Sequence, residues 1–157
     1  MKKIIVVLDN VRSAFNVGSI FRTADASGSV EIYLCGITPT PENTKVLKTS
    51  LGAERTVKYK YFKNTLEAIQ KLKKQNTPIY SIEIEKGSIH FQKFNYFPNK
   101  IEHIALVFGH ELNGVSQPAL DISDKIVHIP MGGTKESLNV AITASILIFE
   151  ALRYNKK

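Results

Sequence analysis

Apolar residues along the chain fall into short runs that are separated by polar segments. Such runs, when rich in β-branched and aromatic side chains, are typical of buried β-strands. They predict strands at Lys3 to Leu8, Glu31 to Cys35, Thr56 to Tyr61, Ile79 to Glu83, Ile104 to Phe108 and Lys125 to Ile129.

Between these runs, apolar residues recur every three or four positions, which is the pattern of a helix with one buried face. It predicts helices at Val17 to Ala26, Lys45 to Leu51, Thr65 to Gln75, Gln117 to Asp121 and Ser137 to Tyr154. Because strands alternate with helices, we expect an α/β domain with a mostly parallel, six-stranded sheet and helices on both faces. Ligands of such sheets bind beyond the carboxyl ends of the strands, so the loops there are the expected functional site.

Length and composition agree with a single domain over residues 1–157. The chain is 43% hydrophobic, and no repeat or linker-like stretch divides it. Its longest apolar runs are much shorter than the roughly 20 residues that a membrane-spanning helix needs, so we expect a soluble protein with no membrane partner. The lone Cys35 lies in an apolar run, which predicts a buried thiol and a reducing cytoplasm.

The formal net charge of +7 favours polyanionic partners. Nine basic residues lie between Lys45 and Lys74 against two acidic ones, with Tyr59, Tyr61 and Phe62 among them. Basic and aromatic residues together are the usual footprint of nucleic-acid binding. A solvated surface with aromatic side chains turned to the core accounts for the segment equally well.

The loop after the first strand leads into a helix through Asn16 and Arg22. Asn16 is placed to cap this helix by accepting a hydrogen bond from the backbone NH of Ser19. Arg22 has two interpretations: an ion pair with Asp25 three residues on, or a contact to a phosphate or ribose of RNA.

The loop from Gly109 to Ser116 follows a buried strand. Its glycine spacing matches a phosphate-binding loop, but Val115 stands where the essential lysine belongs, which argues against a nucleotide triphosphatase. His110-Glu111 begins a zinc-protease motif, but Gly114 replaces the second histidine. No histidine has ligand spacing, so we expect no metal.

The segment from Ile129 to Ala141 joins a strand end, a glycine turn and the start of the last helix. Ser137 is a candidate cap for that helix. Asn139 is less easily explained, because an asparagine is unfavourable inside an apolar helix and its amide needs hydrogen-bond partners. A ligand beside the glycine turn would supply them.

Together these segments resemble the SpoU/TrmH family of RNA ribose 2'-O-methyltransferases, within the SPOUT superfamily of α/β-knotted enzymes. The matching motifs are Asn16-x-Gly18-x-x-x-Arg22-Thr23-Ala24, Phe108-Gly109-x-Glu111-x-x-Gly114-Val115, and Ile129-Pro130-Met131 with Ser137-Leu138-Asn139-Val140-Ala141. The resemblance implies a deep C-terminal trefoil knot, a homodimer and an S-adenosylmethionine cofactor. It also implies that three loops bind the cofactor, through Ile82, Glu83, Phe108, Gly109, Ile129, Pro130, Met131, Ser137 and Leu138.

The resemblance makes Arg22 the leading catalytic candidate, with Asn16 positioning it, and adds Glu111 and Asn139 as further catalytic candidates near the active site. In the family, the arginine of one subunit reaches towards the cofactor of the other. A guanidinium stays protonated in ordinary environments, so we expect Arg22 to orient the ribose rather than to act as the base.

Three other functions stay open. Knotted relatives also methylate bases, and the basic stretch alone would serve a non-enzymatic RNA-binding module. A nucleotide-phosphate enzyme would use the loop at Gly109 but lacks the lysine. The resemblance covers a domain without the N-terminal RNA-binding extension of longer relatives, and the sequence does not distinguish tRNA from rRNA as the substrate.

Overall fold

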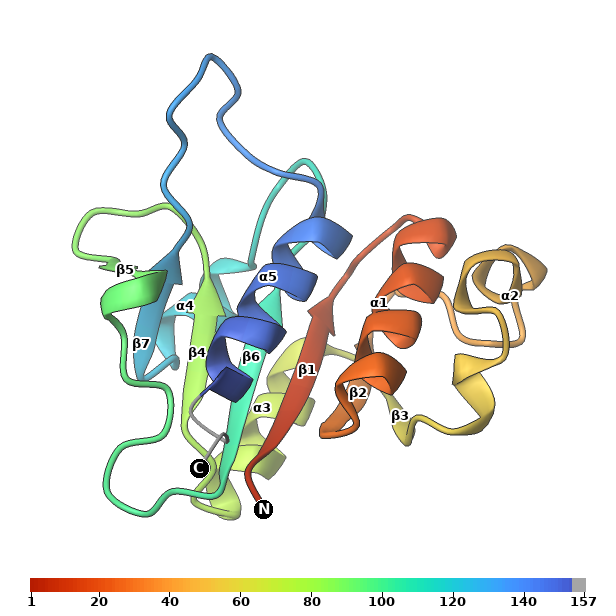
Figure 1. Cartoon of the computed structure of the whole chain (residues 1–157), viewed down its shortest axis with the longest axis horizontal. Coiled ribbons are helices and arrows are strands. Elements are labelled where there is room, and N and C mark those ends of the chain that lie inside the picture. The colour runs from red at the N-terminus through yellow and green to blue at the C-terminus, as the bar shows by residue number, and fades with distance from the viewer. Residues whose placement is uncertain (154–157) are drawn as a thin grey trace.

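The computed structural model describes residues 1–153 of the chain and contains one sheet of seven strands (Figure 1). The strand order is β3-β2-β1-β6-β4-β7-β5, and all neighbouring strands run parallel. The strands are β1 (Lys3–Asp9), β2 (Val30–Cys35), β3 (Tyr59–Phe62), β4 (Ile79–Ile82), β5 (Ile89–His90), β6 (His103–Phe108) and β7 (Lys125–His128).

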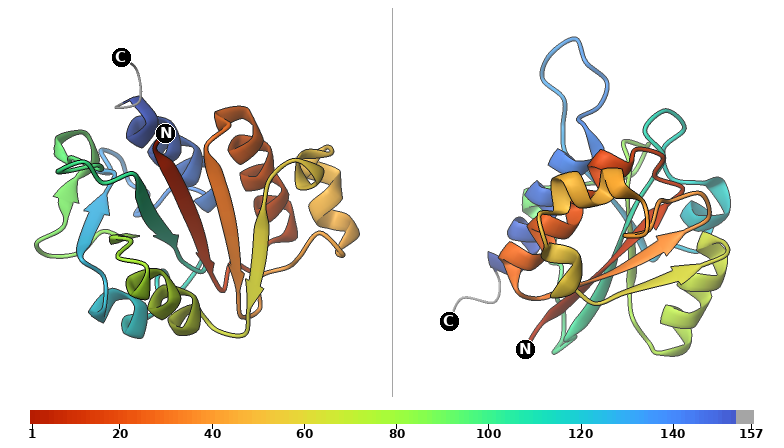
Figure 2. Two further views of the ribbon diagram at one scale, coloured as in Figure 1. Left: turned by 90° about the horizontal axis from the view of Figure 1, so that it is seen from below. Right: turned by 90° about the vertical axis from the view of Figure 1, so that its right-hand side faces the viewer.

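Helices cover both faces of this sheet (Figure 2). Helices α1 (Ala14–Ser27) and α5 (Val140–Leu152) lie on one face, while α3 (Thr65–Lys74) and α4 (Gln117–Asp121) lie on the other. Helix α2 (Thr44–Ser50) packs against α1. Two short 3-10 helices complete the described elements, η1 (Ala53–Arg55) and η2 (Phe91–Lys93).

Two hydrophobic cores separate these layers. Along β1, alternate side chains enter different cores: Ile4, Val6 and Leu8 pack on the side of α1 and α5, and Ile5 and Val7 on the side of α3 and α4. Successive side chains of a strand point to opposite faces, so a strand buried on both faces needs an unbroken apolar run. This explains why the central strands read as continuous hydrophobic segments.

The predicted α/β class, the parallel sheet and the helices on both faces are confirmed, but the strand count is wrong. A seventh strand, β5, lies at the sheet edge and has only two residues, too few to produce a readable pattern. Strand β3 begins at Tyr59 and not at Thr56, because η1 comes before it and the backbone NH of Thr56 donates to Ala53 O, 3.2 Å away.

The ends of two helices also differ from expectation. Helix α1 begins at Ala14, earlier than the predicted Val17, and α5 begins at Val140, later than the predicted Ser137. Tyr154, the predicted end of the last helix, lies outside the described residues. Within residues 1–153, no helix is long and apolar enough to span a bilayer.

Cys35 is buried, as its apolar neighbours predict. Burial, with a smaller contribution from the Asp9 carboxylate, raises the pKa of its thiol to about 12. The thiol is therefore protonated at neutral pH and poorly reactive, which agrees with a structural role.

Candidate functional site

Three loops at the carboxyl edge of the sheet surround a cavity of about 600 Å³. They follow β4, β6 and β7, which are adjacent in the sheet, and the third loop rises above the sheet before it enters α5 (Figure 1). A cavity of this volume lies within the range of small-molecule sites, roughly 300–1,000 Å³. Parallel strands bring their carboxyl ends to one edge, which is why loops far apart in sequence meet here.

Most residues predicted to bind a cofactor line this cavity. They are Ile82, Glu83, Phe108, Gly109, Ile129, Met131, Ser137 and Leu138. Pro130 was also expected there, but it is exposed and does not line the cavity. Glu111 and Asn139, predicted as catalytic, contribute to the wall.

Other lining residues were not predicted, among them His128, whose Nδ1 lies 2.9 Å from the Ser88 hydroxyl. The sequence contained one signal for His128: it directly precedes the motif that begins at Ile129. The acidic Glu136 of the loop before α5 was also missed. Nothing in its local sequence distinguishes it from an ordinary surface residue.

Two glycines allow the loops to approach each other. A Cβ atom at Gly109 would overlap the backbone of Gly114 and Val115. Gly114 has a φ of +69°, and a Cβ there would meet the Glu83 carboxylate. Glu83 itself joins two loops, since its Oε2 accepts a hydrogen bond of 3.0 Å from the backbone NH of Val115.

A chain of hydrogen bonds crosses the mouth of the cavity. The Glu111 carboxylate accepts bonds of 2.9 Å from the backbone NH groups of Arg12 and Ser13, and one of 3.3 Å from Asn16 Nδ2. Asn16 Oδ1 in turn accepts from Asn139 Nδ2 at 3.0 Å. These bonds tie the loop after β6 to the beginnings of both α1 and α5.

The expected cap of α1 at Asn16 is wrong. Ser13 is the N-cap, and its hydroxyl accepts the backbone NH of Asn16 at 3.3 Å. Because Ser13 does the capping, the amide side chain of Asn16 in the first turn is available for Glu111 and Asn139.

Ser137 was likewise expected to cap the last helix, and this too is wrong. Asn139 is the N-cap of α5, with Oδ1 accepting from Ala141 N at 2.8 Å and Ile142 N at 3.3 Å. Asn139 is therefore at the end of the helix and not inside it, which accounts for its poor fit to an apolar helix.

The hydrogen bonds also fix the charge of Glu111. Partial burial acts to raise its pKa, but the backbone NH groups of Arg12 and Ser13 and the Asn16 amide outweigh burial, and the net pKa is lowered. Glu111 is thus a carboxylate at neutral pH that accepts hydrogen bonds, and it is a poor candidate for a proton-transfer group.

Arg22, in contrast, does not line the cavity. It lines a separate hollow of about 460 Å³ between α1, α2 and α5, here called the basic hollow, which is formed by Ser19, Arg22, Thr23, Ala26, Lys48, Thr49, Leu51 and Phe149. The expected pair between Arg22 and Asp25 does not form, since Asp25 accepts the Thr56 hydroxyl instead. Among residues 1–153, the Arg22 guanidinium makes no ion pair.

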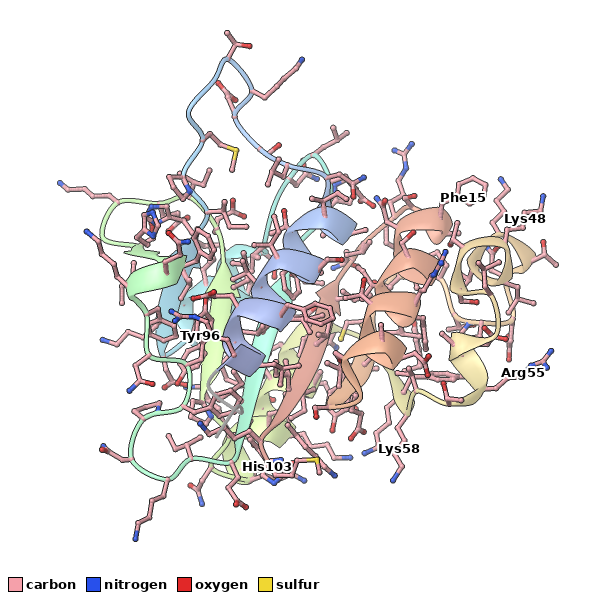
Figure 3. The ribbon with its side chains drawn as sticks, in the orientation of Figure 1. Phe15, Lys48, Arg55, Lys58, Tyr96 and His103 are labelled. Atoms are coloured by element: carbon pink, nitrogen blue, oxygen red, sulfur yellow. The ribbon has the colours of Figure 1, made fainter. Side chains whose placement is uncertain are left out.

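The basic stretch from Lys45 to Lys74 does not form one patch. Lys48 and Arg55 lie on the side of α2 (Figure 3), whereas Lys71 and Lys73 belong to α3 on the opposite face of the sheet. Several of these cations already have partners. Lys60 pairs with Glu31 at 3.0 Å, Lys73 pairs with Asp124 at 3.4 Å, and the Lys71 ammonium lies over the Phe62 ring.

No cluster of metal-ligating side chains is found among residues 1–153. The described part of the chain therefore offers a cavity formed by loops, a hydrogen-bonded network at its mouth, and a basic hollow elsewhere on the α1–α5 face.

Comparison with known proteins identifies the family. The model of the SpoU rRNA Methylase family matches residues 3–149. A tRNA (guanosine(18)-2'-O)-methyltransferase of Thermus thermophilus is 32% identical over 97% of this chain and 75% of its own length.

Solved structures agree with this result. An AdoMet-bound rRNA methyltransferase from Sinorhizobium meliloti has a TM-score of 0.90 at 28% identity, covering 99% of this chain and 57% of that one. A TrmH-family protein from Porphyromonas gingivalis has a TM-score of 0.86 at 30% identity, covering 98% of this chain. The chain spans 60% of that second structure's length. By sequence and by fold, the chain belongs to the SpoU rRNA methylase family.

Proposed function

We propose that this protein is an RNA methyltransferase that transfers a methyl group from S-adenosylmethionine to a ribose 2'-hydroxyl of tRNA or rRNA. One observation carries the proposal: the cavity that eight of the predicted cofactor-binding residues line is acidic. Among residues 1–153, its wall contains Glu83, Glu111 and Glu136 and no lysine or arginine. The names of the relatives, a tRNA 2'-O-methyltransferase and an AdoMet-bound rRNA methyltransferase, support the same reaction.

The charge of this wall fits the cofactor. S-adenosylmethionine has a sulfonium, and carboxylates nearby favour a cation over an anion. A nucleoside triphosphate, with several negative charges, would be repelled by the same three carboxylates. Ile82, Phe108 and Ile129 provide apolar surface for an adenine ring, and the close loop approach at Gly109 exposes backbone groups for hydrogen bonds.

When bound, the cofactor supplies the electrophilic methyl group. The chain's own residues then have to position the ribose, and we assign that role to Arg22, whose guanidinium makes no ion pair among residues 1–153. Its two parallel N–H donors suit a phosphate or the ribose oxygens, and its charge would favour the developing alkoxide. Glu111, Asn16 and Asn139 act indirectly in this proposal by holding α1 and α5 at the cavity mouth.

Because Arg22 lines a different hollow from the cofactor cavity, the proposal requires a homodimer in which Arg22 serves the partner's cofactor. The α1–α5 face supports this arrangement. It exposes three large apolar side chains, with Phe15 at 47%, Ile142 at 53% and Phe149 at 52% exposure. Burial of such side chains is the usual driving force of dimer formation. We propose in addition that the loops before α5 form the trefoil knot.

A base-methylating enzyme and a non-enzymatic RNA-binding module are the alternatives. The module has no use for an acidic cavity, which would repel RNA. The single-domain organisation and the cytoplasmic location stay predictions.

Two measurements test the proposal. Calorimetric titration with S-adenosylmethionine should show binding to the purified protein, and its absence would exclude the enzyme. Transfer of labelled methyl groups to total tRNA and rRNA, followed by nucleoside mass spectrometry, should give a 2'-O-methylated nucleoside. Label found only on a base would show that the methyl acceptor is a base and not the ribose.

A further inference from the structure

The basic hollow has an unusual set of hydrogen-bonding groups. Within the described part of the chain, its wall contains two cations, Arg22 and Lys48, and no carboxylate. Neither cation forms an ion pair among residues 1–153. Two like charges on the wall of one hollow attract an anion to it, so the charge of the hollow favours an anionic ligand.

Two hydroxyl groups of the hollow, those of Ser19 and Thr49, already donate their protons to a backbone carbonyl. Ser19 Oγ donates to the backbone carbonyl of Phe15 at 3.0 Å, and Thr49 Oγ1 donates to the same carbonyl at 2.8 Å. A hydroxyl has a single proton, so Ser19 and Thr49 can offer a ligand only lone pairs.

Thr23, the third residue of the hollow with a hydroxyl group, also donates its proton within the protein. Ser145 Oγ donates to Ala141 O at 2.9 Å, so in its 2.8 Å contact with Thr23 it must be the acceptor. Thr23 therefore donates to Ser145 and has no proton left for the hollow. Arg22 and Lys48 are consequently the only side-chain groups on this wall that can donate to an anion.

The packing of α2 on α1 brings Lys48 to the same hollow as Arg22. A Cβ atom at Gly18 would meet the Val46 carbonyl and the Thr49 hydroxyl, so only glycine allows this approach of the two helices. The shared acceptor at Phe15 fixes the contact. Figure 3 shows Lys48 on α2 next to the end of α1 that contains Phe15.

Another wall of the hollow is apolar and open to solvent, where Leu51 is 67% exposed. An extended ligand can cross such an opening. A phosphodiester with its sugar fits this combination better than a small free anion, which would use only the two cations.

We propose that the basic hollow binds the RNA phosphodiester next to the target ribose, and that Lys48 is a substrate-binding residue that holds this phosphate together with Arg22. The inference rests on the proposed methyltransferase function and adds a residue and a ligand group to it. Arg22 supplies a planar pair of donors, and Lys48 supplies a point charge.

The test uses the full chain and the RNA that accepts label, either unfractionated bacterial tRNA or total rRNA. Lys48→Ala should weaken RNA binding by about 3- to 10-fold and reduce the slope of log K against log salt concentration by about one, the change expected for one lost phosphate contact. The KM for RNA should rise, and the affinity for S-adenosylmethionine should stay unchanged. Lys48→Arg should restore most of the salt slope.

Lys93→Ala is the matched control, because Lys93 is exposed and belongs to η2, which follows edge strand β5 at the opposite edge of the sheet from α2. It should leave the salt slope unchanged. Thermal denaturation of each variant checks that the fold is intact, and Lys48→Glu provides a second variant with a larger electrostatic effect.

Three results overturn the inference. Equal salt slopes for Lys48→Ala and Lys93→Ala would exclude the phosphate contact. Inorganic phosphate that binds in calorimetry as tightly as RNA, and only when Lys48 is present, would make the hollow a free-anion site. A loss of S-adenosylmethionine binding in Lys48→Ala would make the residue structural. In each case a wild type that still methylates RNA leaves the proposed function intact, whereas a wild type that methylates no RNA refutes the function itself.

Discussion

The cavity formed by the loops after β4, β6 and β7 and the basic hollow lie on the same sheet but have opposite charges. Of the residues that the structure describes, three carboxylates and no lysine or arginine line the cavity, while two cations and no carboxylate line the hollow. The two reactants of the proposed reaction also have opposite charges, a sulfonium and a polyanion. In the proposed reaction, separate sites would keep each reactant away from groups that repel it.

The two regions also differ in how their polar groups are used. At the cavity mouth, Glu111, Asn16 and Asn139 bond to one another and to backbone NH groups. In the hollow, Arg22 and Lys48 form no ion pair within residues 1–153. Residues of the first kind should matter for stability as well as for activity, and those of the second kind for activity alone.

The largest effect is expected at Arg22. Arg22→Ala should reduce methyl transfer by about 10²- to 10³-fold, the usual cost of removing one group that stabilises transition-state charge. The free energy of unfolding should change by less than about 0.5 kcal/mol, because a side chain without an ion-pair partner at the surface contributes little. Single-turnover kinetics and urea denaturation measure the two quantities.

Arg22→Lys sharpens this prediction. A lysine keeps the charge but loses the paired donors, so activity should stay well below wild type at every pH. Undiminished activity across the pH range would show that orientation by a guanidinium is not required.

Gly109→Ala tests the cavity. The added methyl overlaps the backbone of Gly114 and Val115, so the loops must move apart. Overpacking of this kind costs about 1–3 kcal/mol, and S-adenosylmethionine should bind at least about 10-fold more weakly in calorimetry. Gly133→Ala is the control, because a Cβ there meets nothing within 4 Å and both properties should be unaffected.

Glu111→Gln should reduce the free energy of unfolding at pH 7 by about 1–2 kcal/mol, since a neutral amide replaces a charged acceptor of three hydrogen bonds. The pKa of Glu111 is lowered in the folded state. Its stabilisation is therefore present above the unfolded pKa of about 4.3 and is lost as the pH falls through the folded value.

The gap between wild type and Glu111→Gln should thus narrow as the pH falls from 7 to about 3. Urea denaturation at several pH values measures it. A gap that stays constant over this range would mean that the charge of Glu111 contributes nothing.

The smallest effect is expected at Asn139, where two substitutions separate two roles. Asn139→Asp keeps a cap acceptor for α5 and removes the amide donor to Asn16, so stability should change by less than about 0.5 kcal/mol while activity falls. Asn139→Ala removes the cap as well and should cost about 1 kcal/mol. Equal unfolding free energies for the two variants would contradict the capping role.

The glycine and asparagine positions show how much of the site local sequence determines. Gly109 and Gly114 are readable as sites of close backbone approach, because a glycine-rich loop directly after a buried strand is typical of a tight turn beside a ligand. Asn139 is readable as unusual for a helix interior, but the sequence favours Ser137 as the cap of the last helix, and Asn139 holds that position. Both residues are capping types two positions apart, and local preference alone does not choose between them.

The neighbours of Asn16 and Arg22 could not be predicted from the sequence, for a different reason. Glu111 lies 95 residues from Asn16 along the chain, and Asn139 lies 123 residues from it. No spacing rule relates such positions. The same holds for Lys48, which belongs with Arg22 only because α2 packs on α1 at Gly18.

By itself the sequence determined the α/β class and the parallel sheet, because hydrophobic periodicity and turn residues act locally. It also contained the motifs by which the chain resembles its family. The tertiary structure alone decided which side chains meet: the acidic wall of the cavity, the network from Glu111 to Asn139, and the separation of Arg22 from both. These contacts join residues that are distant in the chain, and their geometry is set by how helices and loops pack on the sheet.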